Sequence, residues 1–303
     1  MDSRLVAAVT SVSIALVACD DGTSTTGAGG ATTSTTTSMS TVVTGAATGT
    51  SSGGMTSGST STGSTGAGLF SPAPETGWQW QLTGTLDTSI DVPVYDVDMI
   101  ETSDAELAKL KADGRKVICY FSAGSYEPYR PDAAAFAMAD LGNELDGWPG
   151  ERWLDTRSAA VRDIMKARLD VAKQRGCDAV EPDNVDGYSN DSGFPLTPQT
   201  QLDYNQFIAA EAHARGMSVG LKNDLEQVAE LEPFFDWALN EECFAYDECD
   251  VYTPTFIAAN KAVFHAEYVD AGQLSAVCAV TKPLQLSTLV KNLDLDAYRL
   301  TCP

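Results

Sequence analysis

Residues 158–184 read SAAVRDIMKARLDVAKQRGCDAVEPDN, and this stretch contains a helix, a stop signal and a strand in that order. Apolar side chains recur at helical spacing from Ser158 to Arg175, which predicts an amphipathic helix with one buried face. Gly176 then supplies the left-handed conformation that ends many helices. Residues 178–184 follow as a short apolar strand that ends in acidic and polar residues. The stretch therefore predicts a helix that leads directly into a buried strand.

The same order of helix, glycine and strand occurs twice more, in residues 103–122 and in residues 197–223. The earlier copy begins with Ser-Asp-Ala-Glu, a capping-box pattern that satisfies free backbone N–H groups at a helix start. The later copy begins with Thr-Pro, and proline suits the first helical position. Both helices end at a glycine, Gly114 or Gly216. Strands that alternate with helices indicate βα units and a parallel sheet.

Residues 70–303 contain eight candidate strands, and we expect them to form one domain because no second linker interrupts them. The strands are expected at Val92–Asp98, Lys116–Ser122, Arg152–Thr156, Ala179–Asn184, Ser218–Asn223, Trp237–Glu242, Ala262–Tyr268 and Pro283–Leu289. Eight parallel strands in a domain of this length predict an α/β fold of the (β/α)8 TIM-barrel type. An open doubly wound sheet is the alternative, and the lack of a Gly-rich phosphate loop after any strand disfavours it.

The N-terminal part of the chain predicts export. Residues 1–18 contain one basic residue and an apolar run too short to span a membrane, which is typical of a secretory signal peptide. Leu16-Val-Ala-Cys19 resembles a bacterial lipobox, which implies cleavage before Cys19 and lipid attachment to its thiol. An ordinary signal peptide with a chance cysteine is the alternative. Residues 19–69 are almost all Ser, Thr, Gly and Ala and are expected to be a flexible linker, because they cannot bury enough apolar surface to fold. We therefore expect an exported protein of the bacterial cell envelope, attached to a membrane only through the lipid on Cys19, or a secreted one.

The formal net charge is −23 at pH 7, and it lies almost entirely in residues 70–303. This acidity argues against nucleic acid as a partner, because the phosphate backbone would be repelled. It fits either a cationic substrate or partner, or an acidic surface that keeps the protein soluble.

Six cysteines remain when Cys19 is set aside, and an exported domain permits disulfide bonds. Connectivity cannot be deduced from the sequence alone. The expected pairs are Cys243–Cys249 across a loop and Cys278–Cys302 at the C-terminus. Cys119 and Cys177 lie in or beside predicted strands and are expected to be buried thiols.

Acidic side chains gather near the carboxyl ends of most predicted strands, where TIM barrels have their active sites. Two of these ends, at Asp183 and at Glu241 or Glu242, suit hydrolysis of a glycosidic bond, which needs one protonated and one ionised carboxyl. Clustered carboxylates also bind Ca²⁺ or Mg²⁺, but the chain has no EF-hand spacing, and two histidines are too few for a His-based zinc centre. A serine nucleophile is not supported, because no Gly-x-Ser-x-Gly motif is present. We therefore expect a carboxylate pair, with no metal or other cofactor.

Seven motifs stand in the order found in one known enzyme family. They are Trp78-Gln-Trp-Gln-Leu-Thr-Gly84, Tyr95-Asp-Val-Asp98, Lys116-Val-Ile-Cys-Tyr-Phe-Ser-Ala-Gly124, Glu151-Arg-Trp-Leu-Asp155, Glu181-Pro-Asp-Asn-Val-Asp-Gly-Tyr188, Gly220-Leu-Lys-Asn223 and Asn240-Glu-Glu-Cys-Phe244. Together they resemble glycoside hydrolase family 114, the endo-α-1,4-polygalactosaminidases on a (β/α)8 barrel, over about residues 77–300. The resemblance implies a secreted enzyme that cuts galactosamine-containing polysaccharide, whose free amino groups would suit an acidic site.

The resemblance also implies the catalytic residues. The family's strand-four aspartate matches Asp183, and its strand-six glutamate matches Glu241. Strand alternation gives an opposing indication, because Trp237 and Leu239 look like helix-facing residues, which would place Glu242 inside the barrel. We follow the resemblance and keep Glu242 in reserve. Which carboxyl is the acid, and whether the reaction retains or inverts the anomeric configuration, stays open at this point.

Twelve further residues near the same strand ends are expected to bind the substrate. These are Trp80, Asp96, Asp98, Tyr120, Glu181, Asn184, Asp186, Tyr188, Lys222, Asn223, Asn240 and Glu267. The expected partner is galactosamine-containing polysaccharide, and the protein is expected to be a monomer. Two alternatives are a surface polysaccharide-binding barrel with little turnover and a glycosidase of different glycan specificity. Turnover of purified polymer by the wild type and an Asp183→Asn variant distinguishes an enzyme from a binding protein.

Overall fold

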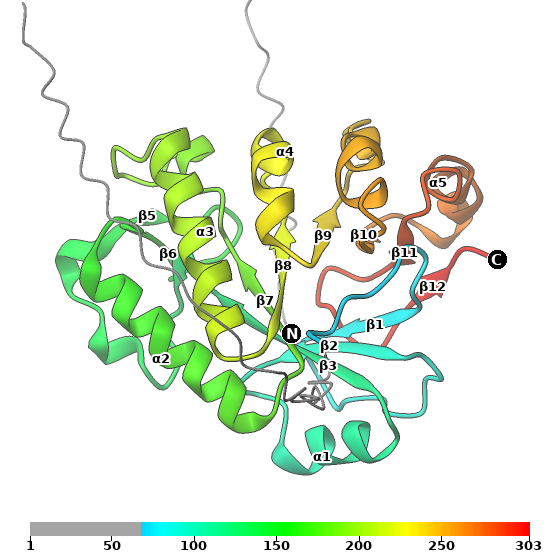
Figure 1. Ribbon diagram of the computed structural model, residues 1–303, viewed down its shortest axis with the longest axis horizontal. Coiled ribbons are helices and arrows are strands. Elements are labelled where there is room, and N and C mark those ends of the chain that lie inside the picture. Colours follow the sequence, from blue (N-terminus) through cyan, green and yellow to red (C-terminus); the bar gives the residue numbers. More distant parts are fainter. Residues whose placement is uncertain (1–67) are drawn as a thin grey trace, which may run out of the picture. The chain divides into compact units, whose positions relative to one another are not determined.

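The computed structural model describes residues 68–303, and its main feature is a curled sheet in which eight neighbouring strands run parallel (Figure 1). In spatial order these strands are β1 (Trp78–Gln81), β2 (Val94–Asp98), β3 (Lys116–Ser122), β7 (Ala179–Asp183), β8 (Ser218–Lys222), β9 (Trp237–Glu241), β10 (Val263–Glu267) and β11 (Ser287–Val290). The short strand β12 (Leu300–Thr301) pairs antiparallel with β11. This α/β architecture is TIM-barrel-like, as predicted. The expected signal peptide, Cys19 and nearly all of the expected linker lie outside the described residues.

Helices lie along the outer side of the sheet (Figure 1). They are α1 (Asp104–Ala112), α2 (Ala159–Arg175), α3 (Pro198–Ala214), α4 (Val228–Leu231) and α5 (Leu274–Thr281). The predicted helix starts are confirmed: Ser103 forms a capping box with Glu106, and Thr197 caps α3 with Pro198 in its first turn. Gly176 ends α2 in the left-handed conformation, with φ of 79°. These local signals set the helix boundaries because they satisfy backbone groups that the helix itself leaves free.

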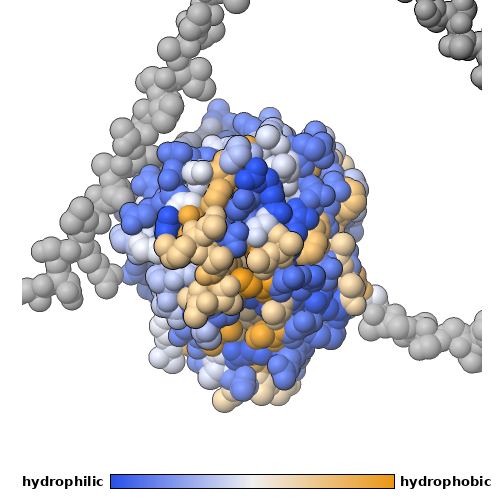
Figure 2. Space-filling model, turned by 90° about the vertical axis from the view of Figure 1, so that its left-hand side faces the viewer, coloured by the Kyte–Doolittle hydropathy of each residue, from blue (hydrophilic) through white to orange (hydrophobic). Residues whose placement is uncertain are grey.

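Shorter helical turns connect the larger elements. The 3-10 turns are Ala133–Ala135, Met138–Asp140, Gly187–Ser189, Leu225–Gln227, Glu232–Phe234, Cys249–Tyr252 and Ala271–Gln273, and Thr253–Ile257 is a π-helical turn. Within residues 68–303, no helix combines the length and the apolar character that crossing a membrane requires. On the face shown in Figure 2, a band of apolar side chains lies between hydrophilic areas, so the surface is mixed in polarity there.

The sheet separates two apolar layers. The inner layer is made of strand residues such as Trp78, Trp80, Trp237 and Phe264, whereas the outer layer joins the alternate strand residues to the helices. Gly220 in β8 makes room for the inner layer, because a Cβ at this position would lie 2.2 Å from the ring of Trp237. The barrel interior is thus filled by large aromatic side chains, which leaves only the strand ends for a cavity.

One predicted strand does not belong to the barrel, and one barrel strand was not predicted. The segment expected at Arg152–Thr156 forms β6 (Arg152–Leu154), the middle strand of a separate antiparallel sheet with β4 (Ser125–Tyr126) and β5 (Leu141–Glu144). β3 therefore pairs directly with β7, and the eighth parallel strand is β1, which pairs with β2. The pattern of helix, glycine and strand does not identify β1, because no helix precedes it in the described residues.

Contacts between β1 and the C-terminal segment join the two sides of the curled sheet. The indole N–H of Trp78 donates to the carbonyl of Ser287 at 2.7 Å, and the backbone N–H of Leu82 donates to the carbonyl of Leu295 at 2.9 Å. Arg299 donates to the carbonyl of Trp78 at 3.0 Å. The first strand is therefore fixed to residues more than 200 positions later in the chain.

All six cysteines of the described region form disulfide bonds. Cys243–Cys249 and Cys278–Cys302 are paired as predicted. The expectation of buried thiols at Cys119 and Cys177 was wrong, because these two residues also form a disulfide. They are 58 positions apart in sequence, and the pairing of β3 with β7 brings them together. Three disulfides are consistent with an exported protein.

Candidate active site

A cavity of about 1040 Å³ opens at the carboxyl ends of the parallel strands. Its wall includes Asp98 at the end of β2, Tyr120 in β3, Asp183 at the end of β7, Lys222 at the end of β8 and Glu241 at the end of β9. Parallel strands end at the same edge of a sheet, and this edge is where barrel enzymes have their active sites. The fold therefore brings side chains from distant parts of the sequence to one place.

Lys222 lies between the two predicted catalytic carboxylates. Its Nζ is 3.1 Å from Oδ1 of Asp183 and 3.1 Å from Oε2 of Glu241. The lysine side chain is 2% exposed, whereas those of Asp183 and Glu241 are 19% and 25% exposed. The two carboxylates are thus held on one buried cation, and both reach the cavity.

Two phenol groups hold the other oxygens of these carboxylates. Tyr120 donates its O–H to Oδ2 of Asp183 at 3.1 Å, and Tyr268 donates its O–H to Oε1 of Glu241. The backbone N–H of Asn184 donates to Oδ1 of Asp183 at 2.8 Å. Burial raises the pKa of both phenols well above the ordinary value, and the nearby carboxylates add to this effect. The phenols therefore keep their protons and remain hydrogen-bond donors.

The backbone turns sharply directly after three strands of the site. Asn184, Asn223 and Glu242 have φ values of 60°, 46° and 63°, in the left-handed region. Asparagine adopts this conformation readily, but a glutamate does so only at a cost, so strain is stored beside Glu241. Asn223 uses its turn to accept a hydrogen bond from the backbone N–H of Glu241 at 2.9 Å. These turns fix the directions in which the strand ends present their side chains.

Gly124, just after β3, permits a close approach to the turn that presents Asp183. Its backbone N–H donates to the carbonyl of Asp183 at 3.0 Å. A Cβ at this position would lie 1.7 Å from the carbonyl oxygen of Asn184, so only glycine fits.

Glu241 lies on the inner side of β9. Trp237 and Leu239 belong to the inner apolar layer, and side chains alternate along a strand, so Glu241 faces the same side as they do. The interpretation that Trp237 and Leu239 face the helices was wrong, and the indication for Glu242 that rested on it no longer holds. Glu242 follows the end of the strand and lines the cavity from there.

Asp96 and Glu181 are fully buried next to Lys222. Oε1 of Glu181 accepts a hydrogen bond from Nζ of Lys222 at 2.9 Å. Burial, with the charge of Glu181, raises the pKa of Asp96 well above its ordinary value, and burial raises the pKa of Glu181 to about 7. Neither carboxyl lines the cavity, although both were expected to contact substrate.

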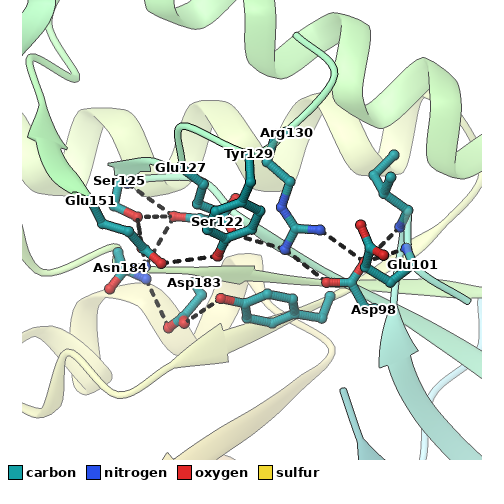
Figure 3. A network of polar contacts seen from close by, with 12 residues as sticks. Asp98, Glu101, Ser122, Ser125, Glu127, Tyr129, Arg130, Glu151, Asp183 and Asn184 are labelled. Atoms are coloured by element: carbon teal, nitrogen blue, oxygen red, sulfur yellow. Dashed lines mark hydrogen bonds and ion pairs between the residues drawn. The ribbon is translucent and has the colours of Figure 1, made fainter. Parts of the chain in front are cut away.

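Arg130 neutralises the predicted substrate contact Asp98 (Figure 3). The guanidinium donates two hydrogen bonds to the Asp98 carboxylate, at 2.9 and 2.7 Å, and lies 2.7 Å from Glu127. Bidentate contacts of this kind are among the strongest that side chains make. Asp98 therefore organises the wall of the cavity and offers less free negative charge than its residue type indicates.

A chain of hydrogen bonds connects the same wall to Asp183 (Figure 3). Ser125 donates to Glu151 at 3.1 Å and lies 2.7 Å from the hydroxyl of Ser122. Asn184 donates its side-chain N–H to Ser122 at 3.0 Å. The side chain next to Asp183 is therefore fixed by groups of β3 and of the small antiparallel sheet.

The structure separates the remaining predicted substrate contacts into two groups. Trp80, Asn184, Asp186 and Asn223 line the cavity, as do Asp98, Tyr120 and Lys222, which are described above. Tyr188, Asn240 and Glu267 do not line it. Glu267 is fully buried on the helix-facing side of β10, where it accepts a hydrogen bond from the N–H of Phe244 at 2.7 Å. The expectation that it contributes to the acidic cavity is corrected accordingly.

Tyr188 and Asn240 have other partners in the fold. Tyr188 donates its O–H to Glu226 at 3.0 Å. Asn240 is fully buried, and its side-chain oxygen accepts from the N–H of Cys243 at 3.0 Å. Asn240 thus shapes the loop after β9 and has no surface to offer to a sugar.

Several cavity residues were not predicted as substrate contacts. They are Glu127, Tyr129, Arg130, Trp148, Glu151, Tyr246 and Tyr268. Most of them lie in loops, where neither helical nor strand periodicity marks a residue. Glu151 stands in one of the family-like motifs and Tyr268 at a predicted strand end, so the sequence did contain a signal for these two.

One group of potential metal ligands occurs among residues 68–303, formed by Cys243, Cys249 and His265 within 4.8 Å of one another. The two cysteines are joined in a disulfide, so they have no thiolate to offer a metal. Nε2 of His265 is 2.8 Å from Oε1 of Glu267, on the buried side of the strand. This group therefore does not fit a metal centre.

Comparisons with known proteins identify the family of the chain. The sequence model of glycoside-hydrolase family GH114 matches residues 59–303. Ega3 from Aspergillus fumigatus, solved in complex with galactosamine, is 44% identical with a TM-score of 0.75, over 78% of this chain and 98% of that chain. The glycoside hydrolase domain of PelA from Pseudomonas aeruginosa, 12% identical with a TM-score of 0.57 over 75% of this chain and 98% of its own, shares the fold. A search of curated proteins found no match. The chain belongs to glycoside-hydrolase family GH114 and is a glycoside hydrolase.

Proposed function

We propose that this glycoside hydrolase cleaves α-1,4-linked galactosamine-containing polysaccharide, with Asp183 and Glu241 as its two catalytic carboxylates. The main observation in support is the pair of carboxylates that Lys222 holds at 3.1 Å each, in an acidic cavity at the strand ends. The similarity to Ega3, which was solved with galactosamine, supports an amino sugar as the substrate unit. The free amino group of such a sugar is cationic and is attracted by an acidic site.

The charge of the cavity favours a cationic polymer. The basic residues that line it are Arg130 and Lys222, and both are bound to carboxylates. The other acidic lining residues include Glu101, Glu144, Asp146, Asp186, Asp191, Asp224, Glu242 and Glu248. Trp148 and Tyr246 also line the cavity and are 55% and 58% exposed, so their faces are open to sugar rings and ammonium groups.

The contacts of the two carboxylates favour different roles. Asp183 accepts hydrogen bonds from Tyr120 and from the N–H of Asn184 and contacts Lys222, so its oxygens are held in a fixed position, as suits a nucleophile. Glu241 has fewer hydrogen-bond donors around it, namely Tyr268 and Lys222. We therefore assign it the role of general acid, which protonates the leaving oxygen and then, as a base, activates water.

The spacing of the carboxylates favours a retaining reaction. One oxygen of each carboxylate lies 3.1 Å from the same Nζ. The distance between these two oxygens is therefore at most twice 3.1 Å. That limit lies below the roughly 6.5–9.5 Å that an inverting enzyme needs for its attacking water. A covalent glycosyl intermediate on Asp183 follows from this geometry.

Chemical N-acetylation of the polymer should slow its cleavage, because each acetyl group removes a cationic amine that the cavity attracts. Added salt should raise the apparent KM on the unacetylated polymer modestly, since the carboxylates are partly exposed and salt screens them. Reducing-end release at several acetylation levels and salt concentrations measures both effects. Equal rates on fully acetylated and deacetylated polymer, without salt dependence, would reject the electrostatic argument. Failure to cut any galactosamine polymer would reject the substrate.

We also propose that the mature enzyme is held at the cell envelope by a lipid on Cys19. The lipobox-like sequence before this residue and the Ser/Thr-rich segment after it support the proposal. A Cys19→Ala variant should lose the lipid and appear in the soluble fraction, whereas the wild type should sediment with membranes. Membrane fractionation with mass spectrometry of the N-terminal peptide measures this. An equal membrane-bound share in both proteins would show that the anchor is absent.

A further inference from the structure

Lys222 is buried among three carboxylates, which leaves little of its ammonium group for a substrate. Its Nζ is 2.9 Å from Glu181 and 3.1 Å from both Asp183 and Glu241. An ammonium group has three N–H donors, and three carboxylates already surround it, one of them, Glu181, by a hydrogen bond. The same nitrogen lies 4.8 Å from the centre of the Trp80 ring, which closes another side. The expected role of Lys222 as a sugar contact is therefore not supported, and its contacts indicate a different role.

Asp96 and Glu181 are two fully buried carboxyls whose charges act on each other. No N–H or O–H donor reaches either oxygen of Asp96 or Oε2 of Glu181, although all three atoms are buried. Two ionised carboxyls buried beside each other repel, and one proton held by the pair removes this repulsion. Burial raises the pKa of Asp96 well above its ordinary value, which places the proton on Asp96. The pair then has one negative charge, on the carboxylate that binds Lys222.

We propose that Lys222, Glu181 and Asp96 form a positioning unit that sets the spacing and the charge of the catalytic pair. Glu181 holds Lys222 from the buried side at 2.9 Å, and the buried Asp96 acts on Glu181 and Lys222 through its charge state. Lys222 in turn holds Asp183 and Glu241 in place by attracting both carboxylates to one cation. The unit acts through the catalytic carboxylates and contacts no sugar. This inference rests on the proposed function for the identity of the catalytic pair.

The ionisable groups that face Lys222 come from several strands. They are Asp96 of β2, Tyr120 of β3, Glu181 and Asp183 of β7 with Asp186 just after it, Glu241 of β9, and Tyr268 just after β10. Both tyrosines keep their protons at all working pH values, as argued above. Burial alone would lower the pKa of Lys222, but the three carboxylates around it raise it well above its ordinary value. Lys222 is therefore a permanent cation, and the carboxyls determine the response to pH.

Two substitutions should move the pH dependence of the reaction in opposite directions. Lys222→Met removes a cation, which makes Asp183 and Glu241 harder to ionise. Both limbs of the bell-shaped kcat/KM profile should then move to higher pH, by about one unit or more, and activity at the wild-type optimum should fall at least about tenfold. Glu181→Gln removes a negative charge that competes for Lys222, so both limbs should move to lower pH. Loss of structure alone would not give shifts of opposite sign.

The experiment measures kcat/KM against pH on α-1,4-linked galactosamine polymer for the wild type, Lys222→Met, Glu181→Gln and Lys261→Met. The last is the matched control, because Lys261 pairs with Glu232 at 2.6 Å and does not line the cavity. Its profile should coincide with that of the wild type, and circular dichroism checks that each variant is folded.

Unchanged profiles in Lys222→Met or Glu181→Gln, or shifts in the same direction, would overturn the inference. If Lys222→Met does not fold, the profile of Glu181→Gln decides alone, because glutamine has the shape of glutamate: a shift to lower pH supports the unit, and no shift overturns it. Failure of the proposed function gives a different result, namely a wild type that leaves the polymer uncut or an Asp183→Asn variant with full activity.

Discussion

Glu241→Gln should lower kcat on galactosamine polymer by about 10²- to 10⁴-fold, the usual contribution of general acid–base catalysis, whereas Glu242→Gln should keep most of the activity. Glu241 lies on the inner side of β9 and contacts both Lys222 and Tyr268. Glu242 lies beyond the strand end with its backbone in the left-handed region and makes no contact with Lys222 among the ion pairs of the described residues. The two variants are matched, because each replaces a glutamate by its neutral isostere at neighbouring positions.

Initial rates of reducing-end release, with circular dichroism to verify folding, measure this difference. Near-wild-type rates for Glu241→Gln, together with a collapse for Glu242→Gln, would move the catalytic role to Glu242. Equally small losses of activity in both variants would show that neither glutamate is the general acid.

Replacing Cys119 and Cys177 by alanine should lower the free energy of unfolding by about 4 kcal/mol, because this disulfide closes a loop of 58 residues in the unfolded chain. Replacing Cys243 and Cys249 in the same way should cost only about 2 kcal/mol, since that disulfide closes a loop of 6 residues. The two pairs are well matched, because all four cysteines are buried.

Denaturant unfolding of both double variants measures the two free energies. A larger loss for the short loop than for the long one would show that loop closure does not dominate and that packing around the sulfurs does.

Local signals predicted much of the fold. Helix boundaries depend on groups only a few residues away. The capping box at Ser103 and the proline after Thr197 mark helix starts, and Gly176 marks a helix end. Seven of the eight strands of the parallel sheet followed from the alternation with helices or from apolar runs. β1 was not predicted, because no helix precedes it in the described residues. The residues that it and the following Leu82 contact, Ser287 and Leu295, come from the other end of the domain.

The inner and outer sides of the sheet could not be distinguished from residue types. The inner and the outer layer are both apolar in a filled barrel. The residue types of Trp237 and Leu239 therefore fit either layer. This ambiguity produced the mistaken indication for Glu242 and the expectation that Glu267 lies in the cavity. Only the register of strands that are distant in sequence decides which alternate residues meet inside.

The sequence predicted which residues meet at the candidate site better than it predicted what each residue does there. Asp183, Lys222 and Glu241 do meet at the strand ends. However, Lys222 was expected to bind sugar, and it is 2% exposed and surrounded by three carboxylates. Asp98 was expected to attract amines, and Arg130 neutralises it from a loop with no regular pattern. A role depends on which partners a side chain has, and these partners are set by the fold.

The most direct test of the central claim follows the anomeric proton of the first product by NMR, with wild type and Asp183→Asn acting on α-1,4-linked galactosamine polymer. The wild type should release new reducing ends in the α configuration, because a reaction through a covalent intermediate on Asp183 retains the configuration of the substrate. Asp183→Asn should release fewer by a factor of about 10² or more. Product formed first as the β anomer would contradict the retaining geometry, and cleavage by Asp183→Asn at the wild-type rate would contradict the assignment of the catalytic pair itself.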